Sequence, residues 1–295
     1  MALDELTTEA RAERPDYDQS TTAELVELMN REDAAVPGAV AAIAAELART
    51  IDAVVERLRS GGRLVYVGAG SSGAIAALDA DECEATFSTE PGQVVALVAG
   101  AGLASEQREA AEDDGGAGSR AVEELGISAR DAVAGVSASG RTPYVVEALR
   151  AASAADALTV AVVAVRDSEL GRIADRELAA VVGPEFVAGS TRLKAGTAQK
   201  LVLNTISTIA MIRLGKTYGD LMVDLRASNE KLEARAQRIV ESATGVSEDE
   251  ARAALTEADG SAKVAIVALL AGIDAKTARE RLDRSDGVIR SALGR

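Results

Sequence analysis

Five short apolar runs, separated by stretches with helical spacing, constrain the fold of this 295-residue chain more than any other feature. Runs of this kind are typical of strands in a parallel sheet that is covered by helices on both faces. The expected strands are 63–67, 93–100, 131–140 (a strand with its following loop), 159–165 and 177–183. We therefore predict an α/β fold with a doubly wound, five-stranded parallel sheet.

Helical patterns precede and interrupt the predicted sheet. A short helix is expected after Thr22, and apolar residues then recur every three or four positions from Pro37 to Ser60, which indicates a second helix with one apolar face. Within the sheet region, Gly and Asp cluster at 113–118, and this cluster predicts a loop.

The C-terminal part of the chain is predicted to be helical. A helix over about 197–214 is apolar nearly all round, so we expect it to be buried in an isologous homodimer. Past residue 244, a capping box at Ser247 precedes three short helices. The expected divisions are an N-terminal helical segment (1–60), a sheet domain with its following helices (61–243) and a small three-helix unit (244–295).

Composition excludes several classes of chemistry. The chain has no histidine, and therefore lacks the commonest general base, the usual zinc ligand and every nucleophile pair that depends on histidine. Its single cysteine, Cys83, excludes an intramolecular disulfide and any multi-cysteine metal site. The net charge of −15 and the absence of tryptophan argue against a nucleic-acid partner. Chemistry is left to carboxylates, hydroxyls, Lys, Arg and backbone amides.

The N-terminus carries no pattern that directs the chain to a membrane. The first twenty residues are polar and acidic, unlike a signal peptide. No apolar run approaches the ~18–20 residues that a membrane-spanning helix needs. We therefore expect a cytoplasmic protein with no membrane partner.

A glycine-rich loop follows the first predicted strand and precedes a helix. Its sequence, GAGSSG (68–73), matches the dinucleotide-binding pattern, but the second strand ends Val-Ala-Gly (98–100), without the acid that would hold a ribose. The hydroxyls of Ser71 and Ser72, followed by Gly73 at a helix N-terminus, suit a phosphate monoester. Alternatively, the glycines serve only close packing between strand and helix.

A second loop of this kind follows the third strand. Ser137, Ser139, Gly140 and Thr142 precede a helix that begins with proline. Because parallel strands end at one edge of the sheet, the two loops are expected to form one ligand crevice there. Ser137 lacks both the G-x-S-x-G pattern and a histidine to activate it, so phosphate binding fits better than nucleophilic catalysis.

The stretch 183–200 is the third candidate binding segment. It places hydroxyls, including that of Ser190, and cations, including Lys194, where the last strand leads into the apolar helix. This composition favours an anion site. The alternative is a surface loop whose cations offset the acidic surface.

Two acids, Glu82 and Glu112, end the helices that follow the first and second strands. In a chain without histidine, two carboxylates in different environments form the natural acid–base pair, and at least one should be partly buried with a raised pKa. From these residues alone, each acid is more often a solvated surface group.

Four motifs resemble those of the N-acetylmuramic acid 6-phosphate etherases, which are sugar-isomerase (SIS) fold proteins related to the glucokinase regulatory protein. The matching segments are GAGSSG, SASGRTPYV, GPEFVAGSTRLKAGTAQK and LMVDLRASNEKL (221–232). The resemblance implies a phosphorylated amino sugar as substrate and no metal or cofactor. It implies cleavage of the lactyl ether of N-acetylmuramate 6-phosphate, by elimination and water addition, to N-acetylglucosamine 6-phosphate and D-lactate.

Residue roles follow from the same resemblance. Glu82 matches the proton donor of the family and Glu112 its second catalytic glutamate. The resemblance also implies a role in amino-sugar catabolism and peptidoglycan recycling. The chain departs from the family pattern at Ala74, where an Arg is usual, and at Asp81 and Glu84 beside the proton donor. Two alternatives therefore stay open: a non-catalytic phosphosugar-sensing regulatory protein, and an SIS enzyme that acts on a related phosphosugar.

Overall fold

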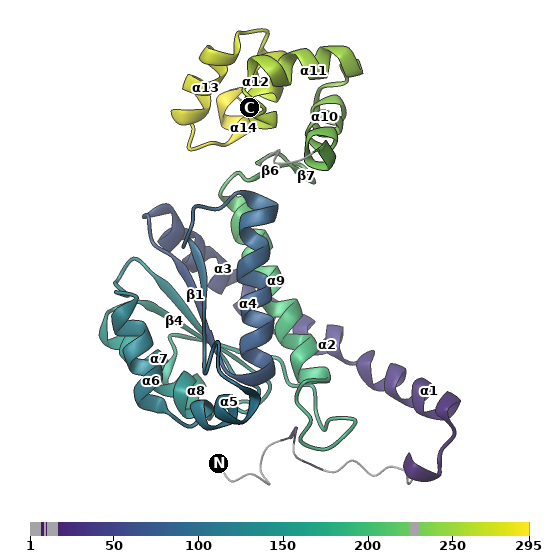
Figure 1. Cartoon of the computed structure of the whole chain (residues 1–295), viewed down its shortest axis with the longest axis vertical. Helices are drawn as coiled ribbons and strands as arrows, with labels where there is room; N and C mark the ends of the chain where they lie inside the picture. The colour runs from purple at the N-terminus through teal and green to yellow at the C-terminus, as the bar shows by residue number, and fades with distance from the viewer. Residues whose placement is uncertain (1–6, 9, 11–16, 225–229, 295) are drawn as a thin grey trace. The chain divides into compact units, whose positions relative to one another are not determined.

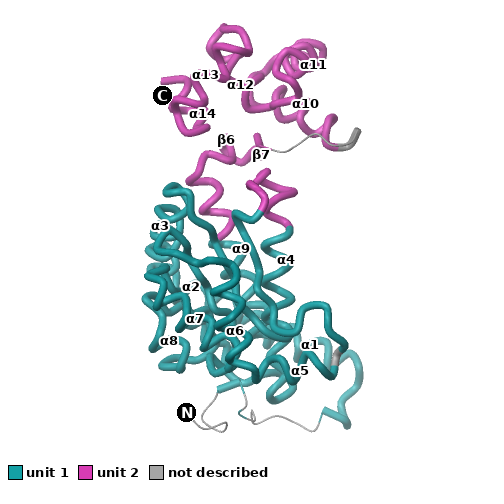
Figure 2. Tube along the Cα trace, turned by 60° about the vertical axis from the view of Figure 1, so that its left-hand side comes forward, with its two compact units in different colours: residues 1–81, 92–206 teal, residues 82–91, 207–295 magenta. Residues whose placement is uncertain are grey.

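The computed structural model describes residues 7–8, 10, 17–224 and 230–294, and its contacts divide the chain into two compact units. Residues 1–81 and 92–206 form the first unit, and residues 82–91 and 207–295 form the second (Figure 2). The N-terminal helices thus belong to the same unit as the sheet. In the described part of the chain, no helix combines the length and the apolar character that crossing a membrane requires.

The first unit contains the five-stranded parallel sheet that the sequence predicts (Figure 1). The strands lie in the order β2-β1-β3-β4-β5, and every neighbouring pair is parallel. Their bounds are β1 Leu64–Gly68, β2 Val94–Val98, β3 Ala132–Val136, β4 Leu158–Val163 and β5 Arg176–Ala179. The parallel pairing confirms the expected fold class. β1, β3 and β4 are fully buried, whereas β2, at one edge, is half-buried.

Nine helices described in this part of the chain accompany the sheet. Their bounds are α1 Thr22–Asp33, α2 Val36–Ala41, α3 Ala44–Arg59, α4 Gly70–Phe87, α5 Ser105–Glu112, α6 Gly115–Glu124, α7 Pro143–Ala154, α8 Glu169–Ile173 and α9 Lys194–Arg213. The single helix predicted between Pro37 and Ser60 is wrong. The backbone leaves helical geometry at Ile43 (φ −104°, ψ 8°), which separates α2 from α3.

The prediction of a loop at 113–118 is also wrong, because α6 begins inside this Gly-rich segment. Asp114 caps the helix by accepting a hydrogen bond from the amide of Ala117 at 2.9 Å. The glycines are needed for packing: a Cβ on Gly118 would overlap the carbonyl oxygen of Tyr144 on α7. Here glycine allows two helices to approach closely, and so it does not mark a break.

Alanine at Gly118 is therefore expected to lower the free energy of unfolding by about 1–3 kcal/mol, because the new methyl group meets backbone atoms that cannot rotate away. Alanine at Gly38 in α2, where a Cβ would meet nothing within 4 Å, is the matched control. It should raise the free energy of unfolding by about 0.5–1 kcal/mol. Urea unfolding of both variants measures the difference, and equal stability would contradict the packing argument.

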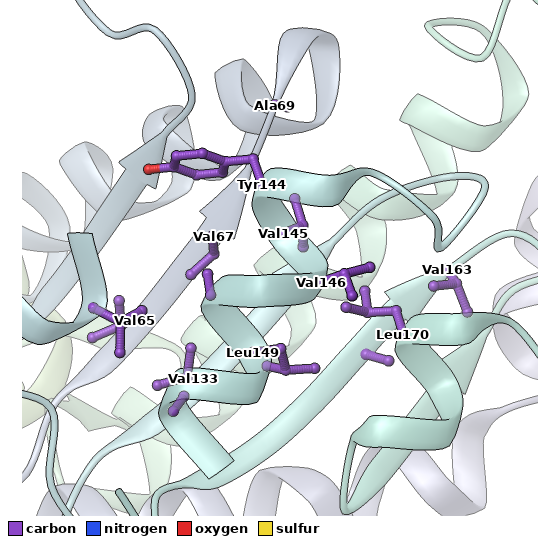
Figure 3. Close-up of a cluster of buried hydrophobic side chains, with 14 of the residues drawn as sticks. Val65, Val67, Ala69, Val133, Tyr144, Val145, Val146, Leu149, Val163 and Leu170 are labelled. Atoms are coloured by element: carbon purple, nitrogen blue, oxygen red, sulfur yellow. The ribbon is translucent and has the colours of Figure 1, made fainter. Parts of the chain in front are cut away.

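The two faces of the sheet are covered differently. On one face, Val65 and Val67 of β1 and Val133 of β3 pack against Leu149 of α7 and Leu170 of α8 (Figure 3). Because side chains alternate along a strand, Tyr66 of β1 points to the other face. Its hydroxyl donates a 2.8 Å hydrogen bond to Asp79 of α4, and Asn204 of α9 donates to the same carboxylate. This network, in which Tyr66 and Asp79 are buried, links β1, α4 and α9.

The second unit contains a hairpin and a helical cluster. Its elements are β6 Thr217–Tyr218, β7 Leu221–Met222, α10 Glu230–Thr244, α11 Glu248–Glu257, α12 Ala262–Ala271, α13 Ala275–Asp283 and α14 Ile289–Ala292. The capping box at Ser247 is confirmed. After residue 244 there are four helices, one more than expected, because α14 is a single turn whose buried Ile289 joins the core of this unit. Residues 225–229 of the fourth motif lie outside the described residues.

Candidate functional site

The two hydroxyl-rich loops begin side by side at the carboxyl edge of the sheet. Gly68, the last residue of β1, is the register partner of Val136, the last residue of β3. The strand order reverses between these strands, since β2 lies on one side of β1 and β3 on the other. Open α/β sheets bind their ligands at such a switch point.

The first loop is compressed into a tight strand–helix turn. Only Ala69 separates β1 from Gly70, the first residue of α4, which has a φ of +50°. A Cβ on Gly68 would lie 2.8 Å from the Cα of Gly73, and a Cβ on Gly73 would lie 2.7 Å from Val98 Cγ1. Gly68 and Gly73 thus allow close packing in this turn, which does not by itself decide whether the loop also binds a ligand.

The two serines of this loop occupy the first turn of α4 in different environments. Ser71 is exposed. Ser72 is half-buried, and its hydroxyl donates a 3.0 Å hydrogen bond to Oε1 of Gln199 on α9. The close packing therefore leaves both serines at the helix N-terminus, where an anion is stabilised by free amides and by the helix dipole.

The second loop forms a compact hydroxyl cluster at the N-terminus of α7. Ser137 Oγ lies 2.9 Å from Thr142 Oγ1 and 3.5 Å from Ser139 Oγ, and it accepts a 3.1 Å hydrogen bond from the amide of Gly140. Gly140 has a φ of +63°, and a Cβ there would overlap Ser168. The loop conformation that gathers the three hydroxyls thus requires glycine at this position.

Glu112 lies beside the first loop. It ends α5, and a Cβ on Gly70 would be only 2.7 Å from its Oε1. Burial raises the pKa of Glu112, and the neighbouring charges of Asp113 and Glu109 raise it further. The expectation of one partly buried glutamate with a raised pKa is confirmed.

Glu82 lies elsewhere on the same helix. It follows Gly70 by twelve residues in α4, and at the rise of an α-helix this is about 18 Å along the axis. Glu82 is exposed, and by its spacing it shares a face of α4 with Ala74 and Leu78, which are also exposed; Leu78 is 59% accessible. The structure therefore places Glu82 far along α4 from the first turn, whereas Glu112 lies beside that turn.

The 183–200 stretch supports the start of α9 from within the chain. The carboxylate of Glu185, 2% exposed, accepts the amides of Lys194 and Ala195 at 2.9 Å each. The buried Lys194 ammonium donates a 2.7 Å hydrogen bond to Glu32 of α1. Glu185 and Glu32 thus bind the helix amides and the Lys194 ammonium, which the sequence assigns to an external anion. Ser190 lies in the preceding turn, where its amide donates to the carbonyl of Val187.

Sequence reasoning missed Gln199, Glu185 and Glu32. Gln199 and Glu185 stand within the third motif, but nothing local shows that one faces Ser72 or that the other caps the helix nine residues later. Glu32 is 162 positions from its partner. In the part of the chain that the structure describes, no three His, Cys, Asp or Glu side chains gather closely enough to hold a metal ion.

Comparisons with known proteins show which family and which fold this chain shares. Residues 46–153 match the family model described as the glucokinase regulatory protein N-terminal SIS domain. The N-acetylmuramic acid 6-phosphate etherase of Rubrobacter xylanophilus is 56% identical over 99% of this chain and 97% of its own. The enzyme of the same name from Streptomyces avermitilis is 54% identical over 99% of this chain and 94% of its own.

Solved structures share the fold at lower identity. The phosphoheptose isomerase of Neisseria gonorrhoeae is 20% identical and superposes with a TM-score of 0.51, over 64% of this chain and 98% of its own. The phosphoheptose isomerase of Francisella tularensis is 18% identical with the same TM-score of 0.51, over 65% of this chain and all of its own (100%). At this identity the likeness shows the fold.

Proposed function

The chain belongs to the family of N-acetylmuramic acid 6-phosphate etherases, and from this premise we propose how its residues carry out the reaction. The protein is a carbon–oxygen lyase that converts N-acetylmuramate 6-phosphate to N-acetylglucosamine 6-phosphate and D-lactate. Incubation of the purified protein with N-acetylmuramate 6-phosphate, followed by an assay for lactate, tests this function directly. Tight binding without lactate release would instead support the regulatory alternative.

The phosphate of the substrate binds between the loops that follow β1 and β3. The register of Gly68 with Val136 carries this assignment, because it brings Ser71 and Ser72 to the same sheet edge as the Ser137–Thr142 cluster. Both loops lead into helix N-termini, whose amides and dipoles attract a compact dianion. A phosphorylated sugar does not cross a bilayer unaided, because its charge does not enter the hydrocarbon core, so the protein acts in the compartment where its substrate is phosphorylated, which we propose is the cytoplasm.

The chemistry needs one acid and one base. Glu112 removes the proton from C2, a double bond forms between C2 and C3, and the C3–oxygen bond breaks as Glu82 protonates the leaving lactate oxygen. Water then adds to C3 while Glu82 takes back a proton from it, and Glu112 returns its proton to C2. Both glutamates end in their starting states, so the cycle balances without a metal or cofactor.

The two glutamates of one site come from two copies of the chain. Along α4, Glu82 lies about 18 Å from the turn that would hold the phosphate, which is too far for one sugar ring to span. The face of α4 that carries Glu82 also exposes Ala74 and Leu78, an apolar surface suited to a partner. An isologous homodimer would cover this face and would place the Glu82 of each copy at the partner's loops.

Alanine at both Ser71 and Ser139 is expected to weaken binding of N-acetylglucosamine 6-phosphate. Each hydrogen bond lost to the phosphate should cost about 1.5–3 kcal/mol, so the loss of two should raise the Kd at least about 100-fold. The matched control is Ser119→Ala on α6, whose hydroxyl donates a hydrogen bond to Glu123 on the same helix. Calorimetry with phosphorylated and unphosphorylated sugar measures the change. Equal affinity of the wild-type protein for both sugars would remove the phosphate assignment.

The raised pKa of Glu112 predicts a pH dependence. As the base, Glu112 must be deprotonated, so kcat/KM should rise with pH through its pKa, above the range of an ordinary glutamate. Asp113→Asn removes one of the charges that raise this pKa, and should therefore shift the rise toward lower pH. Glu106→Gln on the same helix is the control and should leave the profile in place. A profile unmoved by Asp113→Asn would contradict the assignment of Glu112 as the base.

A further inference from the structure

The carboxamide oxygen of Gln199 accepts a hydrogen bond, whereas its buried nitrogen has no partner among the described residues. The side chain is 3% exposed, and Oε1 accepts the hydroxyl of Ser72 at 3.0 Å. Its Nε2 is shielded from solvent and makes no hydrogen bond to any residue that the structure describes. Buried amide donors are almost always paired, because an unpaired donor has lost its water without replacement.

This arrangement does not suit a bound phosphate. A serine hydroxyl has a single proton, and Ser72 donates it to Gln199. Only lone pairs of Ser72 Oγ then remain for a ligand, whereas a phosphate dianion presents only acceptors. The Ser72 hydroxyl can donate to phosphate only if Gln199 stops accepting its proton.

Rotation of the Gln199 carboxamide by a half turn gives Nε2 a partner and also releases the Ser72 proton for a ligand. The rotation exchanges Oε1 and Nε2, so that Nε2 donates to Ser72 Oγ and acquires a partner. The Ser72 proton is then free for a phosphate oxygen. The oxygen that becomes buried in its place is tolerated better than an unpaired amide donor.

We propose that Gln199 is a positioning residue for phosphate recognition, which reverses its hydrogen bond with Ser72 when a phosphosugar binds. This inference rests on the proposed function, in which Ser72 lies at the phosphate. A simple tie between α4 and α9 would not require Gln199, because Asp79 and Asn204 already link these helices. The tie would also leave the buried Nε2 unexplained.

A double-mutant cycle tests the proposal, with Ser72→Ala, Gln199→Met and the pair of substitutions in the full-length protein. Calorimetry would measure the Kd of N-acetylglucosamine 6-phosphate and of N-acetylglucosamine. We expect Ser72→Ala to raise the Kd of the phosphorylated sugar by about 10- to 100-fold and Gln199→Met to raise it by about 10-fold. In the Ser72→Ala background, Gln199→Met should have no further effect, since Gln199 acts through Ser72.

Two further variants keep the result interpretable. In its ionised form, Gln199→Glu can only accept the Ser72 proton and adds a negative charge, so at a pH where this carboxyl is ionised it should weaken phosphosugar binding more than Gln199→Met. Thr205→Val on α9 removes a hydrogen bond to the carbonyl of Leu201 in the same helix and should leave both affinities unchanged. Additive effects of Ser72→Ala and Gln199→Met would overturn the proposal. A wild-type protein that fails to prefer the phosphorylated sugar would instead overturn the proposed function.

Discussion

Glutamine at position 82 is expected to lower the rate of lactate release by about 10²–10⁴-fold, with substrate affinity largely unchanged. Lactate leaves from C3 as a poor alkoxide unless its oxygen receives a proton as the bond breaks. Glutamine keeps the size of Glu82 and some of its hydrogen bonding, but it has no proton to deliver. The loss should therefore appear in kcat, measured as lactate released from N-acetylmuramate 6-phosphate, with little change in KM.

Glu84 provides the matched control for this substitution. It is an exposed glutamate two residues further along α4, so Glu84→Gln removes the same charge from the same helix without removing the proposed acid. We expect that variant to keep activity within a few-fold of the wild-type protein. Wild-type lactate release by Glu82→Gln would show that the acid is assigned wrongly.

The fold could be predicted from the sequence because its signals are local. Each strand is a short apolar run, and Gly and Ser residues at the start of a helix indicate the loops after β1 and β3. Parallel pairing then brings those loops together, as the register of Gly68 with Val136 shows. Neighbouring residues along the chain carry all of this information.

The errors and omissions have a non-local cause. Gly118 lies in a helix that approaches Tyr144 of α7 too closely for a Cβ, and composition alone cannot show this contact. Likewise, Glu185 and Glu32 neutralise groups that the sequence offers to an anion, and the first lies nine residues and the second 162 positions from Lys194. The partner of each such group is set by packing, which no local pattern records.

Mixing two inactive variants is expected to restore activity, if the Glu82 and Glu112 of one site belong to different copies. Glu82→Gln and Glu112→Gln each disable both sites of a homodimer. In a mixed dimer, one site receives both substitutions and the other site receives both native glutamates. After random exchange, half of the dimers are mixed and each has one intact site, so activity should recover to about one quarter of the wild-type value.

The control for this experiment pairs Glu82→Gln with the double variant Glu82→Gln/Glu112→Gln, from which no intact site can form. Subunits would be exchanged by dilute denaturant and dialysis, and native mass spectrometry would confirm the mixed dimer. Recovery only in the first mixture shows that α4 of one copy supplies the acid to the other copy. If mixed dimers form and activity stays at the level of the single variants, both glutamates of a site belong to one chain. The length of α4 argues against that outcome, because Glu82 lies about 18 Å along the helix from the turn that we propose binds the phosphate, beside which Glu112 lies.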